Sequence, residues 1–181
     1  MPGKGKIAAG FSLILLVICS QCFSRSNQPR VIYGRIMPAV SGRTLTGREV
    51  DLPAAAGGKP AVVIFTFSRA AGRDAENWAR RLSIREPRVP VYTVIFLESV
   101  PRLIRGMVVS GIKSEMPPAM QDRAVILFHD EESWKEQLQV SNDGHACVTL
   151  IGADGVVQWV NSESFTDFRF SALTKEIEAL K

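Results

Sequence analysis

Residues 57–82 read GGKPAVVIFTFSRAAGRDAENWARRL. The run AVVIFTF at 61–67 is too continuously apolar for an edge strand, so it predicts a strand buried on both faces at the centre of a parallel or mixed sheet. Behind it, apolar side chains recur at helical spacing, at Ala71, Ala75, Trp78, Ala79 and Leu82. This spacing predicts an amphipathic helix from residue 70 to about residue 85.

The sequence on both sides repeats the alternation of strand and helix. Apolar runs at 89–99 and 123–130 predict two more core strands, and the segment between them predicts a helix that begins near Pro101 and ends at Pro117. Glycine-containing turns predict one hairpin within 42–52 and another within 145–161. A last amphipathic helix is expected over 170–180. Strands that alternate with helices in this order predict a mixed α/β sandwich in one domain.

A short helix is expected after the third core strand. Asp130 is predicted to cap it, with Glu131 and Glu132 near its positive N-terminal end. Trp134 and Leu138 are four residues apart and would form its buried face. Glu131 and Glu132 near His129 would also suit acid–base chemistry, but a role at the start of the helix explains them more simply.

Residues 1–24 are typical of an export leader. Lys4 and Lys6 precede an uncharged, largely apolar run from residue 7 to residue 24, which suits a signal peptide better than a spanning helix of about 20 apolar residues. Cleavage, retention as an uncleaved membrane anchor and lipidation at Cys19 or Cys22 all remain open. We therefore expect an exported, periplasmic or otherwise extracytoplasmic protein, with a leader at 1–24, a tether at 25–40 and one domain at 41–181.

Composition excludes several classes of function. The 181 residues carry a formal net charge of +4, which falls to +2 when Lys4 and Lys6 leave with the leader. Without a basic stripe interleaved with aromatic residues, nucleic-acid binding has little support. Two histidines are too few for a catalytic metal site, and no phosphate-cradling glycine loop or Ser-His-Asp order is present. No metal or cofactor is expected.

The chain resembles the thioredoxin-like superfamily, especially its exported peroxiredoxin-like and thiol-reductase branch. The likeness rests on SGRTLTGREVDL (41–52), GGKPAVVIFTFS (57–68) and TLIGADGVVQW (149–159). It implies a three-layer α/β/α sandwich with a central mixed β-sheet and an N-terminal β-hairpin. It also implies a Cys-x-x-Cys or a peroxidatic cysteine after the central strand, where a helix N-terminus stabilises the thiolate.

The loop at that position has lost the sulfur chemistry. It reads Ser68-Arg69-Ala70-Ala71-Gly72-Arg73-Asp74, so Ala70 and Arg73, or Arg69 alone, occupy the sulfur positions of the superfamily. The superfamily also places a cis-proline opposite this loop, and the matching segment, residues 145–148, contains no proline. We therefore expect a domain that is redox-inactive at the usual site and is not an enzyme there.

A second likeness is to the thioredoxin-like family of mitochondrial ATP-synthase assembly factors, which also lacks the cysteine pair. It rests on Trp78 in RDAENWARRL and on Asn142, Gly144, Gly155 and Trp159 near the closing hairpin. His145 and Gln158 depart from that family's pattern. This resemblance implies a protein partner, such as a membrane complex that the domain helps to assemble, with membrane contact only through the N-terminal segment.

Three hypotheses follow for the candidate residues. The first is a protein-binding or assembly module that presents the loop (Ser68, Arg69, Ala70, Arg73 and Asp74) and the His145 segment to a partner. The alternative is a single-cysteine thiol or peroxide-handling protein that uses Cys147, although an apolar strand favours burial of that thiol. The third is anion binding by Arg69 and Arg73, against the simpler view that both are solvated while Asp74 complements the helix dipole.

Overall fold

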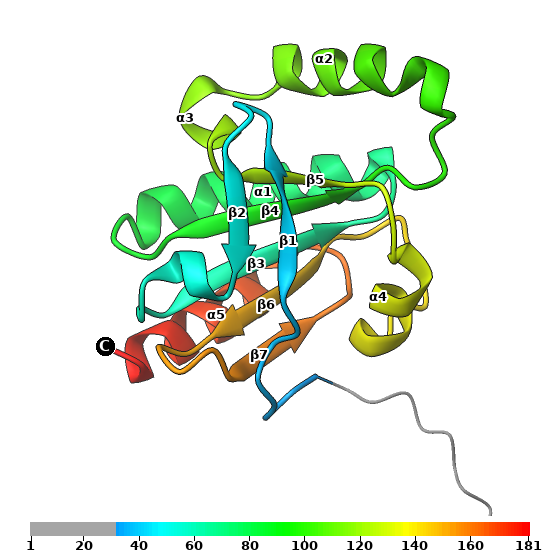
Figure 1. The fold of residues 1–181 in the computed structure, drawn as a ribbon. Helices are drawn as coiled ribbons and strands as arrows, with labels where there is room; N and C mark the ends of the chain where they lie inside the picture. Colours follow the sequence, from blue (N-terminus) through cyan, green and yellow to red (C-terminus); the bar gives the residue numbers. More distant parts are fainter. Residues whose placement is uncertain (1–31) are drawn as a thin grey trace, which may run out of the picture.

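The structure is a computed structural model and describes residues 32–181 (Figure 1). Within that range the strands form one sheet of seven in the order β2-β1-β5-β4-β3-β6-β7. The strands are β1 (Val40–Thr44), β2 (Glu49–Leu52), β3 (Ala61–Thr66), β4 (Val91–Phe96), β5 (Ala124–Leu127), β6 (Cys147–Ile151) and β7 (Val157–Asn161). The helices are α1 (Arg69–Arg85), α2 (Arg105–Glu115), α3 (Pro118–Gln121), α4 (Glu131–Leu138) and α5 (Asp167–Ala179), with 3-10 turns at Ala54–Ala56 and Arg102–Ile104.

Strand β3 lies inside the sheet, as its apolar run predicts. It pairs in parallel with β4 and antiparallel with β6, and all six of its residues are buried. Strands β4 and β5 continue the parallel part, while the hairpins β1–β2 and β6–β7 are antiparallel. The predicted mixed sheet is therefore confirmed.

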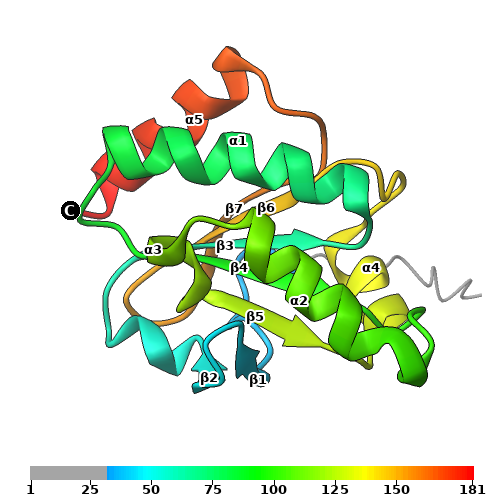
Figure 2. The same ribbon diagram turned by 90° about the horizontal axis from the view of Figure 1, so that it is seen from above.

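Helices α1, α2 and α5 cover one face of the sheet (Figure 2). Trp78 of α1 and Leu173 and Ile177 of α5 pack in one core cluster with Val62 and Ile64 of β3. Helix α2 packs less deeply, because no residue of α2 is fully buried and only partly buried side chains reach the cluster over β5. One face of the sandwich is thus covered by two deeply packed helices and one shallow helix.

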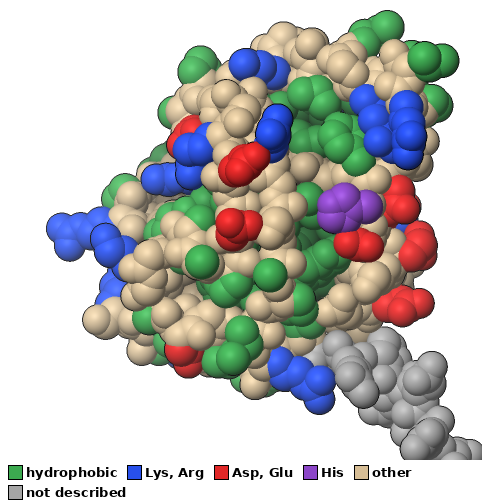
Figure 3. All heavy atoms as spheres, viewed as in Figure 1, with side chains coloured by type: hydrophobic (Ala, Val, Ile, Leu, Met, Phe, Trp, Pro, Cys, Tyr) green, Lys and Arg blue, Asp and Glu red, His purple; other side chains and the backbone are tan. Residues whose placement is uncertain are grey.

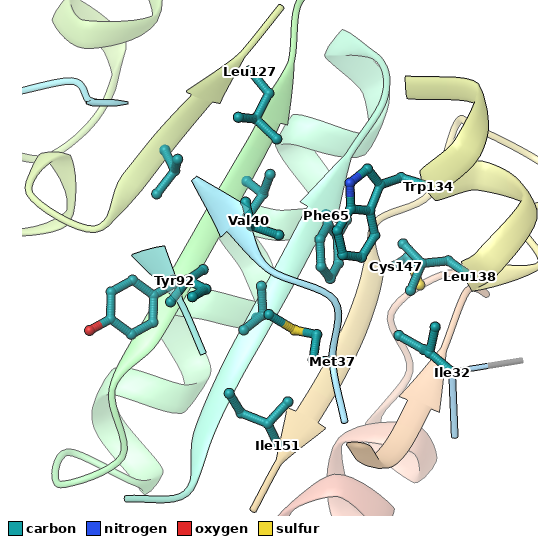
Figure 4. Close-up of a cluster of buried hydrophobic side chains, with 14 of the residues drawn as sticks. Ile32, Met37, Val40, Phe65, Tyr92, Leu127, Trp134, Leu138, Cys147 and Ile151 are labelled. Atoms are coloured by element: carbon teal, nitrogen blue, oxygen red, sulfur yellow. The ribbon is translucent and has the colours of Figure 1, made fainter. Parts of the chain in front are cut away.

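The other face is covered by α4 and by the first hairpin, which crosses in front of β3 and β4 in Figure 1. Phe65 of β3 stacks on Trp134 of α4 with 4.9 Å between ring centroids, and Val40 and Cys147 belong to the same core cluster (Figure 4). Helix α4 buries Trp134 and Leu138, as predicted. Together these layers make the expected three-layer sandwich.

Asp130 occupies the predicted N-cap position of α4, but the expected side-chain cap is wrong. Asp130 has a left-handed backbone conformation (φ 64°) and its side chain caps no helical N–H. Its Oδ2 lies 2.7 Å from Nδ1 of His129, while Oε2 of Glu98 accepts the N–H of Glu131 at 2.8 Å. A cap from the loop after β4 is a long-range contact that local sequence does not encode.

The segment expected to be a tether lies partly within the described residues. Ile32 and Met37 are buried in the core cluster beneath the first hairpin, and Ile36 forms a β-bridge with Val156. The leader at 1–24 lies outside the described residues, so its fate stays a prediction. Among residues 32–181, no helix is long and apolar enough to cross a membrane.

Candidate functional site

The degenerate loop starts at the carboxyl end of β3, where Ser68 caps α1. Ser68 has an extended backbone, and its Oγ accepts the N–H of Ala71 at 3.1 Å. The same hydroxyl donates to the backbone oxygen of Asp143 at 2.7 Å. Ser68 therefore both satisfies a helix N-terminal donor and joins the loop to the segment that leads into β6.

Asp74 makes a second connection between the same two regions. Its Oδ2 accepts the backbone N–H of Ala146 at 3.0 Å, and its Oδ1 accepts the N–H of Phe165 at 3.2 Å. The half-buried carboxylate thus holds the first turns of α1 to the start of β6 and to the segment before α5. Because both oxygens accept internal bonds, Asp74 serves the fold more than it serves a partner.

The other loop residues face solvent. Arg69, Ala70, Gly72 and Arg73 are all exposed. Arg69 forms an ion pair of 3.5 Å with Glu115 at the end of α2, but the two side chains are 84% and 73% exposed, so the pair stabilises the fold little. Arg73 has no side-chain partner within residues 32–181. The exposed part of the loop thus presents a methyl group and two guanidinium groups to solvent.

Cys147 lies one residue beyond Ala146 but points into the core. It pairs in register with Phe65, and its side chain is fully buried near Leu138 (Figure 4). Burial raises the pKa of the Cys147 thiol to about 12. A thiol in this state is almost entirely protonated at neutral pH, and the protonated form is a poor nucleophile.

Lys135 lies beside the loop and escapes sequence reasoning, although its partner Glu131 does not. Nζ of Lys135 lies 2.8 Å from Oε1 of Glu131 and 3.9 Å from Oδ2 of Asp143, and it sits 5.6 Å from the centre of the Phe67 ring. Its hydrogen bond to Glu131 raises the pKa of Lys135. Glu131 and Lys135 are four residues apart, so the sequence could have predicted their ion pair. It could not have predicted that the pair lies beside the loop.

The described residues around the loop offer neither a metal-ligating cluster nor an exposed thiol. No group of three His, Cys, Asp or Glu side chains could hold a metal ion there. The sole thiol of residues 32–181 is buried, and the side chains of Ser68 and Asp74 are already bonded to the backbone. What this part of the molecule offers is a fixed, cation-bearing surface.

Comparison with known proteins identifies the fold. A candidate DsbE thiol:disulfide interchange protein from Chlorobium tepidum is 16% identical, with a TM-score of 0.58 over 83% of this chain and 98% of that one. The exposed lipoprotein thioredoxin of Streptococcus pneumoniae strain TIGR4 is 13% identical, with a TM-score of 0.56 over 78% and 99%. BsSco, of the Sco family of cytochrome c oxidase assembly proteins, is 14% identical, with a TM-score of 0.50 over 79% and 93%.

The chain therefore has the thioredoxin-like fold that its sequence predicts. No family model matches it, and no curated protein matches it. At identities of 13–16% the similarity concerns the fold and not the activity.

Proposed function

We propose that this protein is a redox-inactive, exported thioredoxin-like domain that binds a protein partner and helps a membrane complex to assemble. The observation that carries the proposal is the N-terminus of α1, where the fold usually holds its thiol. Here Ser68 and Asp74 tie the loop to the segment that leads into β6, and no cysteine of residues 32–181 reaches it. A preformed surface without a reactive group suits binding, because little order has to be gained when a partner docks.

The neighbouring helix supports the same view. Leu103 and Met107, near the start of α2, are 99% and 73% exposed. Hydrophobic side chains gather along the edge of the molecule where α2 lies, at the top of Figure 3. Large apolar side chains grouped on one exposed helix are a common sign of a protein contact. The ion pair between Arg69 and Glu115 joins the loop to the far end of this helix.

Two of the proteins with a similar fold agree with the proposed export and the proposed assembly role. One is described as an exposed lipoprotein, and another belongs to a family of assembly proteins for a respiratory oxidase. Export of this chain rests on the leader at 1–24, and an assembly role rests on the second likeness in its sequence.

Site-specific photocrosslinking in the cell of origin tests the proposal. A photoreactive amino acid is placed at Arg69, at Met107 or, as a control, at Ile84, which is exposed on the opposite end of α1. We expect the first two positions to give adducts with subunits of one membrane complex, and the control to give none. The same adducts from all three positions, or from none, would contradict the proposal.

The alternative, a thiol or peroxide-handling protein that uses Cys147, gains no support from this geometry. It needs the buried thiol to reach solvent in the native state. Rapid modification of the folded protein by a maleimide or by peroxide would revive it, and labelling that waits for denaturation would remove it.

A further inference from the structure

A basic pocket lies at the opposite end of the sheet from the degenerate loop. Strands β3, β4 and β5 are parallel neighbours, so their amino ends meet along one edge of the sheet. Lys59 comes two residues before β3, Arg88 three residues before β4, and Arg123 directly before β5. All three line one pocket of about 240 Å³, and Tyr92 and Pro90 also line it.

The three cations have no ion-pair or hydrogen-bond partner of their own among the described residues. Within residues 32–181, the side chains of Lys59, Arg88 and Arg123 make no ion pair and no hydrogen bond, and no carboxylate lines the pocket. Positive side chains gather at the left edge of Figure 3, the side on which the amino ends of β3 and β4 lie in Figure 1. Like charges held close together repel, and a bound anion would relieve that repulsion.

The acidic residues nearest in sequence are already neutralised. Asp122, beside Arg123, accepts two hydrogen bonds of 3.0 Å from the guanidinium of Arg48. Glu86, two residues before Arg88, is buried and pairs with Nζ of Lys181 at 2.8 Å. Each carboxylate has its own cation. Besides the hydrogen bond from Arg48, the charge of Arg123 helps to lower the pKa of the Asp122 carboxyl. The charges of Lys59 and Arg88 are therefore the least compensated of the three.

The walls of the pocket are fixed by the fold. The hydroxyl of Tyr92 donates to the backbone oxygen of Ala55 at 2.8 Å, which joins β4 to the turn before β3. Tyr92 is buried, and Pro90 restricts the backbone between Arg88 and β4. The cations therefore extend from anchored backbone positions rather than from a long loop.

We propose that this pocket binds a small anion that carries one or two phosphate groups. Its volume of about 240 Å³ lies below the roughly 300 Å³ at which pockets for drug-sized ligands begin, so a whole nucleotide would not be enclosed. Two arginines and a lysine suit phosphate oxygens, because guanidinium forks donate paired hydrogen bonds and the ammonium adds a compact charge. The same chemistry is offered by a soluble diphosphate and by a phosphorylated lipid headgroup.

Titration with pyrophosphate tests the soluble source. At an ionic strength of about 0.15 M, where long-range attraction is screened, we expect saturable binding by calorimetry and shifts of the Tyr92 and Arg123 amide signals in NMR spectra. The variant K59A/R88A/R123A should bind at least about tenfold more weakly. Its thermal midpoint without ligand is measured alongside, so that a folding defect is recognised; single substitutions then replace the triple variant.

A control variant removes the same charge elsewhere. R69A/R73A/K113A also loses three exposed cations and should bind pyrophosphate as the wild type does. If both variants bound pyrophosphate equally weakly, the loss of affinity would follow from net charge alone. If only the control variant lost affinity, the anion would bind at the degenerate loop instead. Either result overturns the proposal.

Vesicle flotation tests the lipid source. Phosphatidylcholine vesicles with and without phosphatidic acid are mixed with the wild type and with K59A/R88A/R123A. Binding that needs both phosphatidic acid and the three cations identifies a headgroup as the source, whereas pyrophosphate binding alone identifies a soluble anion. The absence of both kinds of binding overturns the proposal.

Discussion

Ala146 donates its backbone N–H to Oδ2 of Asp74 at 3.0 Å, and this bond joins the two loops that meet beyond the carboxyl end of β3. The thioredoxin-like proteins that the sequence resembles place a cis-proline beside their redox loop. A proline at position 146 would have no N–H to donate, so it would leave Oδ2 of Asp74 without this partner. Asp74 would therefore keep only its bond to the N–H of Phe165 if position 146 were a proline.

Substitution of Asp74 tests this link. In D74A, the N–H groups of Ala146 and Phe165 both lose their acceptor, so we expect the free energy of unfolding to fall by about 1–3 kcal/mol. A146P should destabilise for the same reason, since it removes the donor. Chemical denaturation measures both. The control is E76A, at an exposed position on the same helix, which should change stability by less than about 0.5 kcal/mol. If D74A and E76A changed the free energy of unfolding equally, the role given to Asp74 would be contradicted.

Gly42 lies in a closely packed part of the structure, whereas Gly72 lies on an open helix surface. A Cβ on Gly42 would lie 2.6 Å from Cγ1 of Val125 and 2.9 Å from Cδ2 of Leu127, whereas a Cβ on Gly72 would meet nothing within 4 Å. We expect G42A to destabilise by about 1–3 kcal/mol, since the first hairpin has to move off β5. G72A should stabilise α1 by up to about 1 kcal/mol. Thermal and chemical unfolding measure both, and shifts of the same sign would contradict this account.

The sequence predicts the fold well because its strongest signals are periodic and local. The continuous apolar run forms β3, and the helical spacing around Trp78 forms α1, as predicted. The two hairpins form at the predicted glycine turns. These patterns depend on near neighbours in the chain. They are therefore visible without knowledge of the tertiary structure.

Tertiary contacts explain what the sequence could not predict. The cap of α4 comes from Glu98, 33 residues away from Glu131, and Asp74 bonds to a residue 72 positions later. Lys135 lies next to the loop only because α4 folds back over Phe67. Likewise, Lys59, Arg88 and Arg123 look like scattered surface cations until the parallel strands bring their positions together.

The burial of Cys147 should make the stability of the protein fall at alkaline pH. Its folded pKa of about 12 lies above the ordinary value of 9.0, so the folded state keeps its proton while the unfolded state loses it. Stability from this group is complete below pH 9 and falls as pH rises toward 12, by up to about 1.4 kcal/mol per pH unit. We expect the difference in unfolding free energy between wild type and C147A to shrink across that range. A difference that is constant with pH would mean that the thiol is accessible.

Two thiols introduced at the loop would test whether redox activity lacks only the sulfur atoms or also suitable surroundings. Positions 70 and 73 are three apart in the first turns of α1, a spacing that brings side chains within reach of a disulfide. In a C147A background, we expect A70C/R73C to form that disulfide on oxidation. The new thiol at position 70 should have a pKa below that of a free cysteine, because the helix N-terminus and Arg69 favour the thiolate.

Catalysis should nevertheless remain poor in A70C/R73C. A substrate disulfide needs free backbone groups beside the thiols, and here the N–H of Ala146 is already donated to Asp74 while the backbone oxygen of Asp143 already accepts from Ser68. We expect insulin reduction to stay near the background level of A70S/R73S, which has similar side-chain size but no thiol. Adding D74A should raise the rate, because it releases the segment before β6 from α1 and lets its backbone move toward the thiols. High activity in A70C/R73C alone would show that these loops obstruct nothing and that only the sulfur atoms are missing.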